Sequence, residues 1–371
     1  MRVQNLAFNW RHFDFWLLGS VALLVIFGIT MIRSAVAGNI ELVELDLVRR
    51  QAIFAIGGVV AMLAVAAIDY RLWASISRPL FIGTVIALSA LTILGAALFG
   101  SARWFDTGVI LIQPSEIAKI VLILVLADYF TRNQQNIQRL SYVARSFFLA
   151  MFITVPILLQ PNLSTSIVMI VLWFAMLWAS GLRIRHLLLF IAGGLFLPLL
   201  AFPLLVDYQQ RRILNFLFPD PNARHGDIYN IQQALISIGS GGLLGQGYGQ
   251  GTQVQLRFLK VRWSDFIFSA MAHEFGFLGT LVVILVLLFV IWRCLRAARL
   301  ASDTFGALIA YGVATMITFQ AMVNIGVNLN LMPATGLTLP FVSYGGSSLL
   351  STLIGIGLVE SVILRHRALE F

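Results

Sequence analysis

The residues best suited to chemistry are a few charged side chains that stand at the edges of long apolar runs. Asp265 follows the chain's one long polar stretch, residues 207–263, and directly precedes the apolar run 266–271. A carboxylate at that depth loses part of its hydration. It can accept a proton from a bound substrate, or it can form a structural ion pair. Position alone leaves both interpretations open.

A second group of charges opens another apolar run, at Gln113-Pro114-Ser115-Glu116 with Lys119. Proline suits a first helical turn, and Glu116 and Lys119 share one helix face because they are three residues apart. Each charge alone would cost roughly 2.5–3.5 kcal/mol at the centre of a membrane helix, so we expect them to pair. The pair either locks the helix bundle or lines a polar cavity in which Lys119 meets an anionic group and Glu116 orients it. We favour the cavity.

The segment from Asn324 to Ser348 is polar and rich in helix breakers, but it carries no charge. Irregular backbone at membrane depth is tolerated only inside protein or beside water, so this segment is expected to line a cavity. Backbone amides near Gly345 and Gly346, next to a helix N-terminus, would suit an anion. Ser343, Ser347 and Ser348 add hydroxyl groups.

Other polar motifs predict no separate site. Asp265 and Glu274 are nine residues apart and do not form a carboxylate dyad. His225 and Asp227 lack a third ligand at useful spacing, so no metal site is predicted. The glycine run 239–251 follows no strand and has no Gly-Lys-Ser/Thr, so it indicates tight turns rather than a nucleotide site. The one cysteine, Cys294, excludes an internal disulfide.

The elements that position these residues are membrane helices. Of 371 residues, 59% are hydrophobic and 11% are charged, with a mean hydropathy of +0.91. This composition excludes a soluble globular protein. The predicted fold is all-α, a single polytopic membrane domain over residues 1–371. We predict ten transmembrane helices near 14–33, 51–68, 80–99, 113–130, 146–160, 164–181, 186–206, 265–292, 305–328 and 341–364.

The arginines predict the orientation of this bundle. One set of segments carries Arg2, Arg11, Arg71, Arg78, Arg132, Arg139, Arg145, Arg183, Arg185, Arg293, Arg296, Arg299, Arg365 and Arg367, whereas the opposite short loops hold Arg49, Arg50 and Arg103. Both termini are therefore expected in the cytoplasm, with the 207–263 loop outside. The net charge of +9 is explained by this topology and by anionic lipid, and no nucleic acid partner is predicted. Residues 208–218 have one apolar and one basic side, and they either lie in the interface, with Arg211 and Arg212 near lipid phosphates, or pack on the bundle.

At these residues the chain resembles the SEDS family of cell-wall polymerases, in its elongation branch. The carriers are Arg103-Trp104, the 113–119 motif, Tyr229 and Gln232, Asp265-Phe266-Ile267 and, over the longest stretch, residues 324–348. The resemblance implies a ten-helix bacterial cytoplasmic-membrane enzyme that polymerises lipid II into glycan strands outside the membrane. It also implies partnership with a class B penicillin-binding protein, through that protein's membrane helix and extracytoplasmic region, and with other elongation-complex membrane proteins.

On this basis we hypothesise that Asp265 is the general base of an inverting transfer. Lys119, with Arg103 or with Arg211 and Arg212, would neutralise the leaving pyrophosphate, and Glu116 would hold Lys119. The remaining substrate-binding residues would be Gln113, Ser115, Ser343, Gly345, Gly346 and Ser347. A divalent cation, Mg²⁺ or Mn²⁺, could assist, although no ligand cluster is predicted for one.

The chain also departs from the family pattern. Asn162 stands where an aspartate is usual, residues 260–264 read Lys-Val-Arg-Trp-Ser before the acid, and His273 replaces the first glutamate of a Glu-Glu pair. Two other functions stay open: a lipid-precursor flippase, and a non-catalytic scaffold for a penicillin-binding protein. The charges near Asp265 and Glu116 favour catalysis over both.

Overall fold

The computed structural model describes residues 12–37, 46–99, 103–106, 111–137, 139–182, 193, 202–220 and 226–366. Within these ranges the long helices are α1 (Phe15–Val36), α3 (Leu47–Ala67), α4 (Tyr70–Phe99), α5 (Pro114–Arg132), α6 (Leu140–Leu159), α7 (Leu163–Ala179), α12 (Ile267–Leu300), α13 (Thr304–Asn328) and α14 (Gly346–Leu364). They correspond to nine of the predicted spans. The tenth, 186–206, lies largely outside the described residues.

The all-α membrane fold is confirmed. Seven of these helices are long and apolar enough to cross a membrane. α5 and α7 are the other two: α5 carries four charged residues, and α7 has only 17 residues. The helix α4 begins ten residues before the predicted span and contains Pro79. One antiparallel pair of two-residue strands, β1 (Phe105–Asp106) and β2 (Leu111–Ile112), interrupts the helical pattern.

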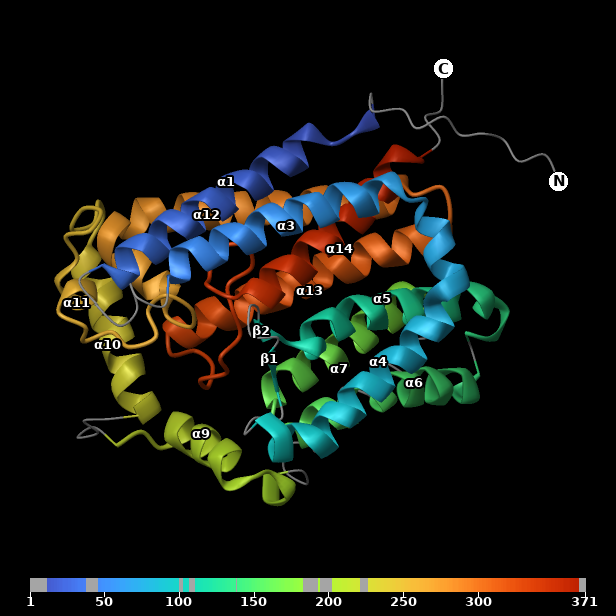
Figure 1. Cartoon of the computed structure of the whole chain (residues 1–371), viewed down its shortest axis with the longest axis horizontal. Helices are drawn as coiled ribbons and strands as arrows, with labels where there is room; N and C mark the ends of the chain where they lie inside the picture. The colour runs from blue at the N-terminus through green and yellow to red at the C-terminus, as the bar shows by residue number, and fades with distance from the viewer. Residues whose placement is uncertain are drawn as a thin grey trace.

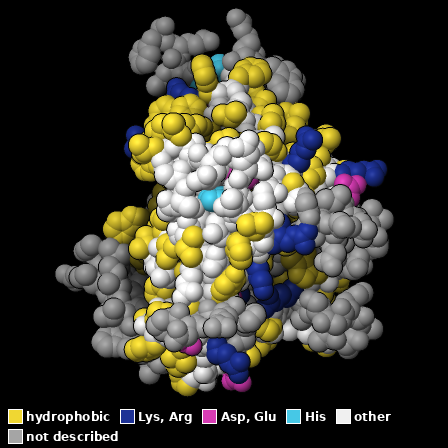
Figure 2. Space-filling model, turned by 90° about the vertical axis from the view of Figure 1, so that its left-hand side faces the viewer, with side chains coloured by type: hydrophobic (Ala, Val, Ile, Leu, Met, Phe, Trp, Pro, Cys, Tyr) yellow, Lys and Arg dark blue, Asp and Glu magenta, His cyan; other side chains and the backbone are white. Residues whose placement is uncertain are grey.

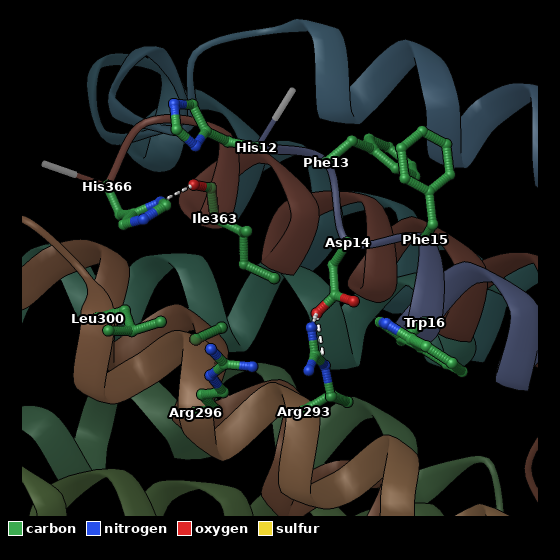
Figure 3. A pocket seen from close by; sticks show the side chains of 11 residues that line it. His12, Phe13, Asp14, Phe15, Trp16, Arg293, Arg296, Leu300, Ile363 and His366 are labelled. Carbon is green, nitrogen blue, oxygen red and sulfur yellow. Dashed lines mark hydrogen bonds and ion pairs between the residues drawn. The ribbon is translucent and has the colours of Figure 1, made fainter. Parts of the chain in front are cut away.

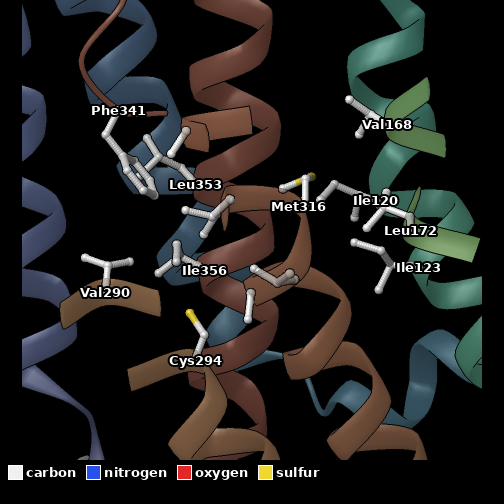
Figure 4. Packing of buried hydrophobic residues seen from close by; sticks show 14 of the residues in the cluster. Ile120, Ile123, Val168, Leu172, Val290, Cys294, Met316, Phe341, Leu353 and Ile356 are labelled. Carbon is white, nitrogen blue, oxygen red and sulfur yellow. The ribbon is translucent and has the colours of Figure 1, made fainter. Parts of the chain in front are cut away.

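The helices lie side by side with close backbone contacts (Figure 1). The helices α3 and α14 approach most closely at glycines: a Cβ at Gly357 would be 2.5 Å from Met62 O, and one at Gly58 would be 2.5 Å from Leu353 Cδ1. Small residues at such crossings are how membrane helices gain packing. The centre is filled by aliphatic side chains of α5, α7, α13 and α14, including Ile120, Leu172 and Met316 (Figure 4).

The long loop after the seventh predicted span folds as a cap of short helices, α9 (Asp207–Leu217), α10 (Gly226–Gly241) and α11 (Thr252–Gln255). The helix predicted over 208–218 is present as α9. The glycine run makes the predicted tight turns, with positive φ at Gly242, Gly245, Gly247 and Gly249. These turns and α10 pack on the first part of α12.

The helix α12 is broken, which the sequence did not predict. Gly276 has φ 67° and ψ −165°, outside the helical region. The glycine turn fills the break: Gln246 N donates to His273 O and Gly247 N donates to Glu274 O, each at 3.0 Å. Phe277 N donates in return to Gly242 O at 2.9 Å. Because α12 begins only at Ile267, Asp265 and Glu274 do not share one helix.

Candidate functional site

One cavity of about 650 Å³ contains most of the predicted site residues. It lies among the first turns of α5, α7 and α14, the helix α9, the segment before α12 and the loop 333–338. Its charged and polar lining consists of Arg50, Arg103, Gln113, Glu116, Asn162, Ser164, Thr165, Gln209, Arg212, Ser264, Asp265, Thr335, Thr338, Tyr344, Ser347 and Ser348, and Gly345 and Gly346 complete the α14 end. The prediction that the 324–348 segment lines a cavity is confirmed.

Asp265 is held by its backbone while its carboxylate reaches the cavity. Asn324 and Asn328, one turn apart on α13, donate their Nδ2 groups to the Asp265 carbonyl at 3.1 and 2.9 Å. Ser264 Oγ donates to Asp265 Oδ1 at 2.9 Å. Within the described ranges Asp265 forms no ion pair. The geometry therefore favours a base over a structural salt bridge.

The surroundings of Asp265 make it a stronger base than an exposed aspartate. Burial raises the pKa of its carboxyl, and the Ser264 hydroxyl and the Arg212 charge offset part of that rise. The charge of Asp227 raises the same pKa further. Desolvation disfavours the charged carboxylate, so the ionised group gains more by taking a proton from a substrate hydroxyl.

The pairing of Glu116 with Lys119 is confirmed. The positions of the two side chains differ from the prediction, because Glu116 and not Lys119 faces the cavity. Lys119 Nζ lies 2.7 Å from Glu116 Oε2, and Ser351 Oγ of α14 donates to the same oxygen at 3.3 Å. Glu116 lines the cavity, whereas Lys119 is 0% exposed and lies behind it. The predicted direct contact between Lys119 and an anion does not fit this burial. Lys119 instead neutralises Glu116.

Three arginines bring positive charge to the cavity: Arg50 of α3, Arg103 and Arg212 of α9. Sequence reasoning used Arg50 only for topology. Its position in a short loop on the side predicted for Asp265 was the signal that could have identified it. Figure 2 shows the face that lies on the left in Figure 1. Several Lys and Arg side chains gather in the right-hand half of this face.

Two of these arginines are oriented by neighbouring backbone. Arg103 donates to the carbonyl groups of residues 160–161, through Nε at 2.9 Å and Nη2 at 2.5 Å. Arg212 pairs with Asp227 at 3.2 Å and donates to Ala334 O at 3.1 Å. Fixed guanidinium groups bind phosphate oxygens with a smaller loss of side-chain entropy than mobile ones.

Three helices begin at the cavity wall. Their N-cap residues Gln113, Asn162 and Gly345 all line it, at the starts of α5, α7 and α14. A helix N-terminus presents free N–H groups and the positive end of the helix dipole. Three such ends together with three arginines make a site suited to a large anion, in particular a phosphate group.

Four predicted site residues lie outside the lining: Ser115, Lys119, Arg211 and Ser343. Ser115 is buried, and Arg211 is exposed. Ser343 Oγ donates to Ser264 O at 2.7 Å and accepts from Leu339 N at 2.9 Å. Ser343 therefore positions the segment beside Asp265 and is not free to hold an anion.

The departures from the family pattern have local structural roles. Asn162 Oδ1 accepts from Thr165 N at 3.4 Å and caps α7, as an aspartate would. The substitution keeps the cap and makes the cavity less negative. Arg262 is buried, with its guanidinium 5.9 Å from the centre of the Trp263 ring, and Trp263 O accepts from Tyr344 N at 2.9 Å. Of the rewritten residues only Ser264 lines the cavity, whereas Trp263 holds the backbone of Tyr344, which does line it.

The donor set does not fit a divalent cation held by protein alone. The cavity offers two carboxylates, Glu116 and Asp265, and Glu116 is already paired with Lys119. In the described part of the chain, no group of three or more His, Cys, Asp or Glu side chains could hold a metal. Mg²⁺ usually keeps several waters and is bound by one or two carboxylates together with substrate phosphates, so an ion here would need the pyrophosphate as a ligand, and no site made by protein alone is assigned to it.

Comparison with known proteins agrees with the geometry. The FtsW/RodA/SpoVE family, described as cell cycle protein, matches residues 15–368. A probable peptidoglycan glycosyltransferase FtsW of Geobacter metallireducens is 36% identical over 366 residues, covering 96% of each chain. The peptidoglycan glycosyltransferase MrdB of Escherichia coli K12 is 35% identical over 360 residues, covering 97% of this chain and 95% of the relative.

Solved structures share the fold. A chain of a peptidoglycan synthase complex, studied for the coordination of polymerization and crosslinking, superposes with a TM-score of 0.80 at 30% identity, over 95% of this chain and 98% of that one. The rod shape determining protein RodA of Thermus thermophilus gives a TM-score of 0.72 at 29% identity, over 97% and 99% of the two chains. This chain is a multi-pass membrane protein, and it belongs to the FtsW/RodA/SpoVE family of cell cycle proteins.

Proposed function

We propose that this protein is a peptidoglycan glycosyltransferase that polymerises lipid II into glycan strands. The observation that carries the proposal is one cavity in which a basic carboxylate, Asp265, is combined with three arginines and three helix N-termini. A sugar pyrophosphate needs both parts: a base for the attacking hydroxyl and a positive site for the leaving group. The names of the relatives support the same reaction class.

In the proposed reaction Asp265 removes the proton from the acceptor sugar hydroxyl. The hydroxyl oxygen forms a bond to the donor's anomeric carbon as the bond from that carbon to the pyrophosphate breaks. The bonding electrons leave with the undecaprenyl pyrophosphate. Glu116 is held by Lys119 and does not serve as a covalent nucleophile, so a single displacement inverts the α-linked donor into a β-linked product.

The pyrophosphate charge is stabilised by groups already in place. Arg103 and Arg212 are oriented by backbone carbonyl groups, and Arg50 adds a third charge. Prepositioned charges stabilise a leaving anion without reorganisation in the transition state. Glu116, neutralised by Lys119, accepts hydrogen bonds from sugar or peptide donors of the substrate. No step is assigned to a metal.

We further propose that the cavity opens outside the bacterial cytoplasmic membrane, with both termini in the cytoplasm. The distribution of arginines supports this orientation. A class B penicillin-binding protein would crosslink the product, and the similarity to a chain of a peptidoglycan synthase complex supports such a partner. Cell elongation is the proposed cellular role.

The test is glycan polymerisation from purified lipid II, with a cognate penicillin-binding protein whose transpeptidase is blocked. Wild type is compared with Asp265→Asn and with Asp46→Asn, a control in which an exposed aspartate outside the cavity lining loses the same charge. Polymer from wild type and Asp46→Asn, but not from Asp265→Asn, is the expected result.

A fully active Asp265→Asn variant would remove this carboxylate from the mechanism. Absence of polymer from all three folded proteins would reject the glycosyltransferase and favour a scaffold or a flippase. Those two are separated by measuring lipid II transfer between the leaflets of a vesicle.

A further inference from the structure

A second cavity, of about 310 Å³, lies at the other end of the bundle, where α1 begins and α12 and α14 end (Figure 3). Its lining combines charged and aromatic groups: His12, Phe13, Asp14, Phe15, Trp16, Arg293, Arg296, Ala297, Leu300, Ile363 and His366. None of these residues takes part in the proposed transfer reaction. The cavity therefore needs an explanation of its own.

The described lining of this cavity has more positive than negative side chains. Asp14 is paired with Arg293, whose Nε donates to Asp14 Oδ2 at 2.6 Å, so these two charges cancel. The Asp14 backbone N–H donates to buried Glu360 at 3.1 Å, which fixes the pair against α14. Arg296 forms no ion pair within the described residues, and its guanidinium lies 6.0 Å from the Trp292 ring centre. Among the described residues that line the cavity, Arg296 is thus one positive charge beyond the Asp14–Arg293 pair.

Two histidines lie beside Arg296 in the lining of this cavity. The ring of His12 meets that of His366 edge-on at 5.3 Å between centroids. His366 Nδ1 is bonded to Ile363 O, a carbonyl that can only accept, so Nδ1 carries a proton. Its Nε2 can therefore donate to an anion only when that nitrogen is protonated as well, in the imidazolium form. Figure 3 shows Arg296 and both histidines on one side of the Asp14–Arg293 pair. This arrangement suits an anion with several oxygens.

Exposed aromatic side chains place the cavity at the membrane surface. Phe15 is 64% exposed and Trp16 is 73% exposed, both in the first turn of α1, and Trp292, 52% exposed, lies where the apolar part of α12 gives way to Arg293. Aromatic side chains at the ends of membrane helices lie at the level of the lipid headgroups. A ligand in this cavity would therefore have its charged part at headgroup depth and apolar side chains below it.

We propose that this cavity binds the phosphate group of an anionic phospholipid, with Arg296 as the principal contact and the two histidines as additional donors in their imidazolium form. Basic pockets between membrane helices are known to hold such headgroups. The lipid would bridge α1, α12 and α14 at the end opposite Asp265. A soluble phosphate has the same chemistry, but the aromatic side chains around the cavity favour a lipid.

The experiment is native mass spectrometry of the delipidated full-length protein titrated with phosphatidylglycerol or phosphatidylcholine. The variants are Arg296→Gln and Arg296→Lys. Arg299→Gln is the matched control, because Arg299 is three residues further along α12, exposed, and absent from the cavity lining. Thermal unfolding of each variant checks that it is folded.

We expect wild type to prefer phosphatidylglycerol, and Arg296→Gln to bind it about fivefold more weakly, the typical effect of one arginine on an anionic lipid. Arg296→Lys and Arg299→Gln should bind as wild type does. Equal binding of the two lipids, or the same loss in Arg296→Gln and Arg299→Gln, would overturn the proposal. Release of phosphatidylglycerol by excess inorganic phosphate would replace the lipid with a soluble phosphate as the occupant.

Discussion

Asp265 and Glu274 are two carboxylates nine residues apart, and the structure gives them opposite environments. Asp265 is fixed through its backbone carbonyl by Asn324 and Asn328, which leaves its side chain at the large cavity. Glu274 is 1% exposed, accepts a hydrogen bond from Ser34 and does not line that cavity. The first arrangement presents a carboxylate to a ligand, and the second buries one inside the fold. Contact with the large cavity, rather than position in the sequence, distinguishes a candidate base from a packing residue.

The largest effect expected from this comparison is on activity. Asp265→Asn should lower glycan polymerisation by roughly 10²–10⁴-fold, the usual contribution of a general base. Glu274→Gln, which keeps a hydrogen-bonding oxygen near Ser34, should retain at least a tenth of wild-type activity. The rate of lipid II consumption measures both. Equal losses in the two variants would erase the distinction between the sites.

The next effect concerns the broken helix that holds Glu274. Gly276→Ala should lower the free energy of unfolding by about 1–3 kcal/mol, because this backbone conformation is almost restricted to glycine. The new Cβ would also lie 2.4 Å from Gly245 N. Thermal unfolding in detergent measures the change.

Gly239→Ala is the control for Gly276→Ala, since a Cβ at Gly239 meets nothing within 4 Å and lies within the helix α10. Similar unfolding temperatures for the two variants would mean that the glycine turn does not need the break in α12.

The break in α12 could not be predicted from the sequence. The span predicted over 265–292 is mostly apolar, and isolated glycines such as Gly276 and Gly279 are tolerated inside a helix, so a continuous span was predicted. The helix breaks because the distant turn around Gly245 supplies hydrogen bonds to His273 O and Glu274 O. Those partners are tertiary and have no local signal. Apart from α12, six described helices were predictable from length and hydropathy, whereas α5 and α7 do not meet that criterion.

The site was predictable in its residue types but not in its arrangement. The spacing of Glu116 and Lys119 correctly predicted a pair on one face. Which of the two reaches the cavity depends on tertiary packing, in which residues far away in sequence, such as Ser351 of α14, contact the pair. For Arg50 the sequence indicated only the side of the membrane, and the packing of α3 against α14 brings it to the cavity.

A smaller effect is expected from the asparagines that hold Asp265. Asn328→Ala removes the hydrogen bond to the Asp265 carbonyl and the acceptor for Ser269 N at 3.0 Å. We expect about a tenfold loss of activity, since a neutral hydrogen bond is worth about 1 kcal/mol and misplacement adds to this. If Asn328 acts by positioning Asp265, Asn328→Ala should cause no further loss in an Asp265→Asn background. An additive loss would assign Asn328 a separate role.

The smallest effect is that of Asp265→Asn on thermal stability, which should rise although activity falls. The pKa of Asp265 is raised in the folded protein, so folding favours the protonated form, and the ionised carboxylate costs stability as the pH rises through that pKa. Asp265→Asn should therefore unfold at a slightly higher temperature than wild type at neutral pH. The gain should shrink as the pH falls and wild-type Asp265 becomes protonated.

Activity of wild type should fall over the same acidic range, because the proposed base must be ionised. Thermal unfolding and polymerisation measured across one pH series test both statements, and a gain that stays constant with pH would show that Asp265 is not destabilised by its burial.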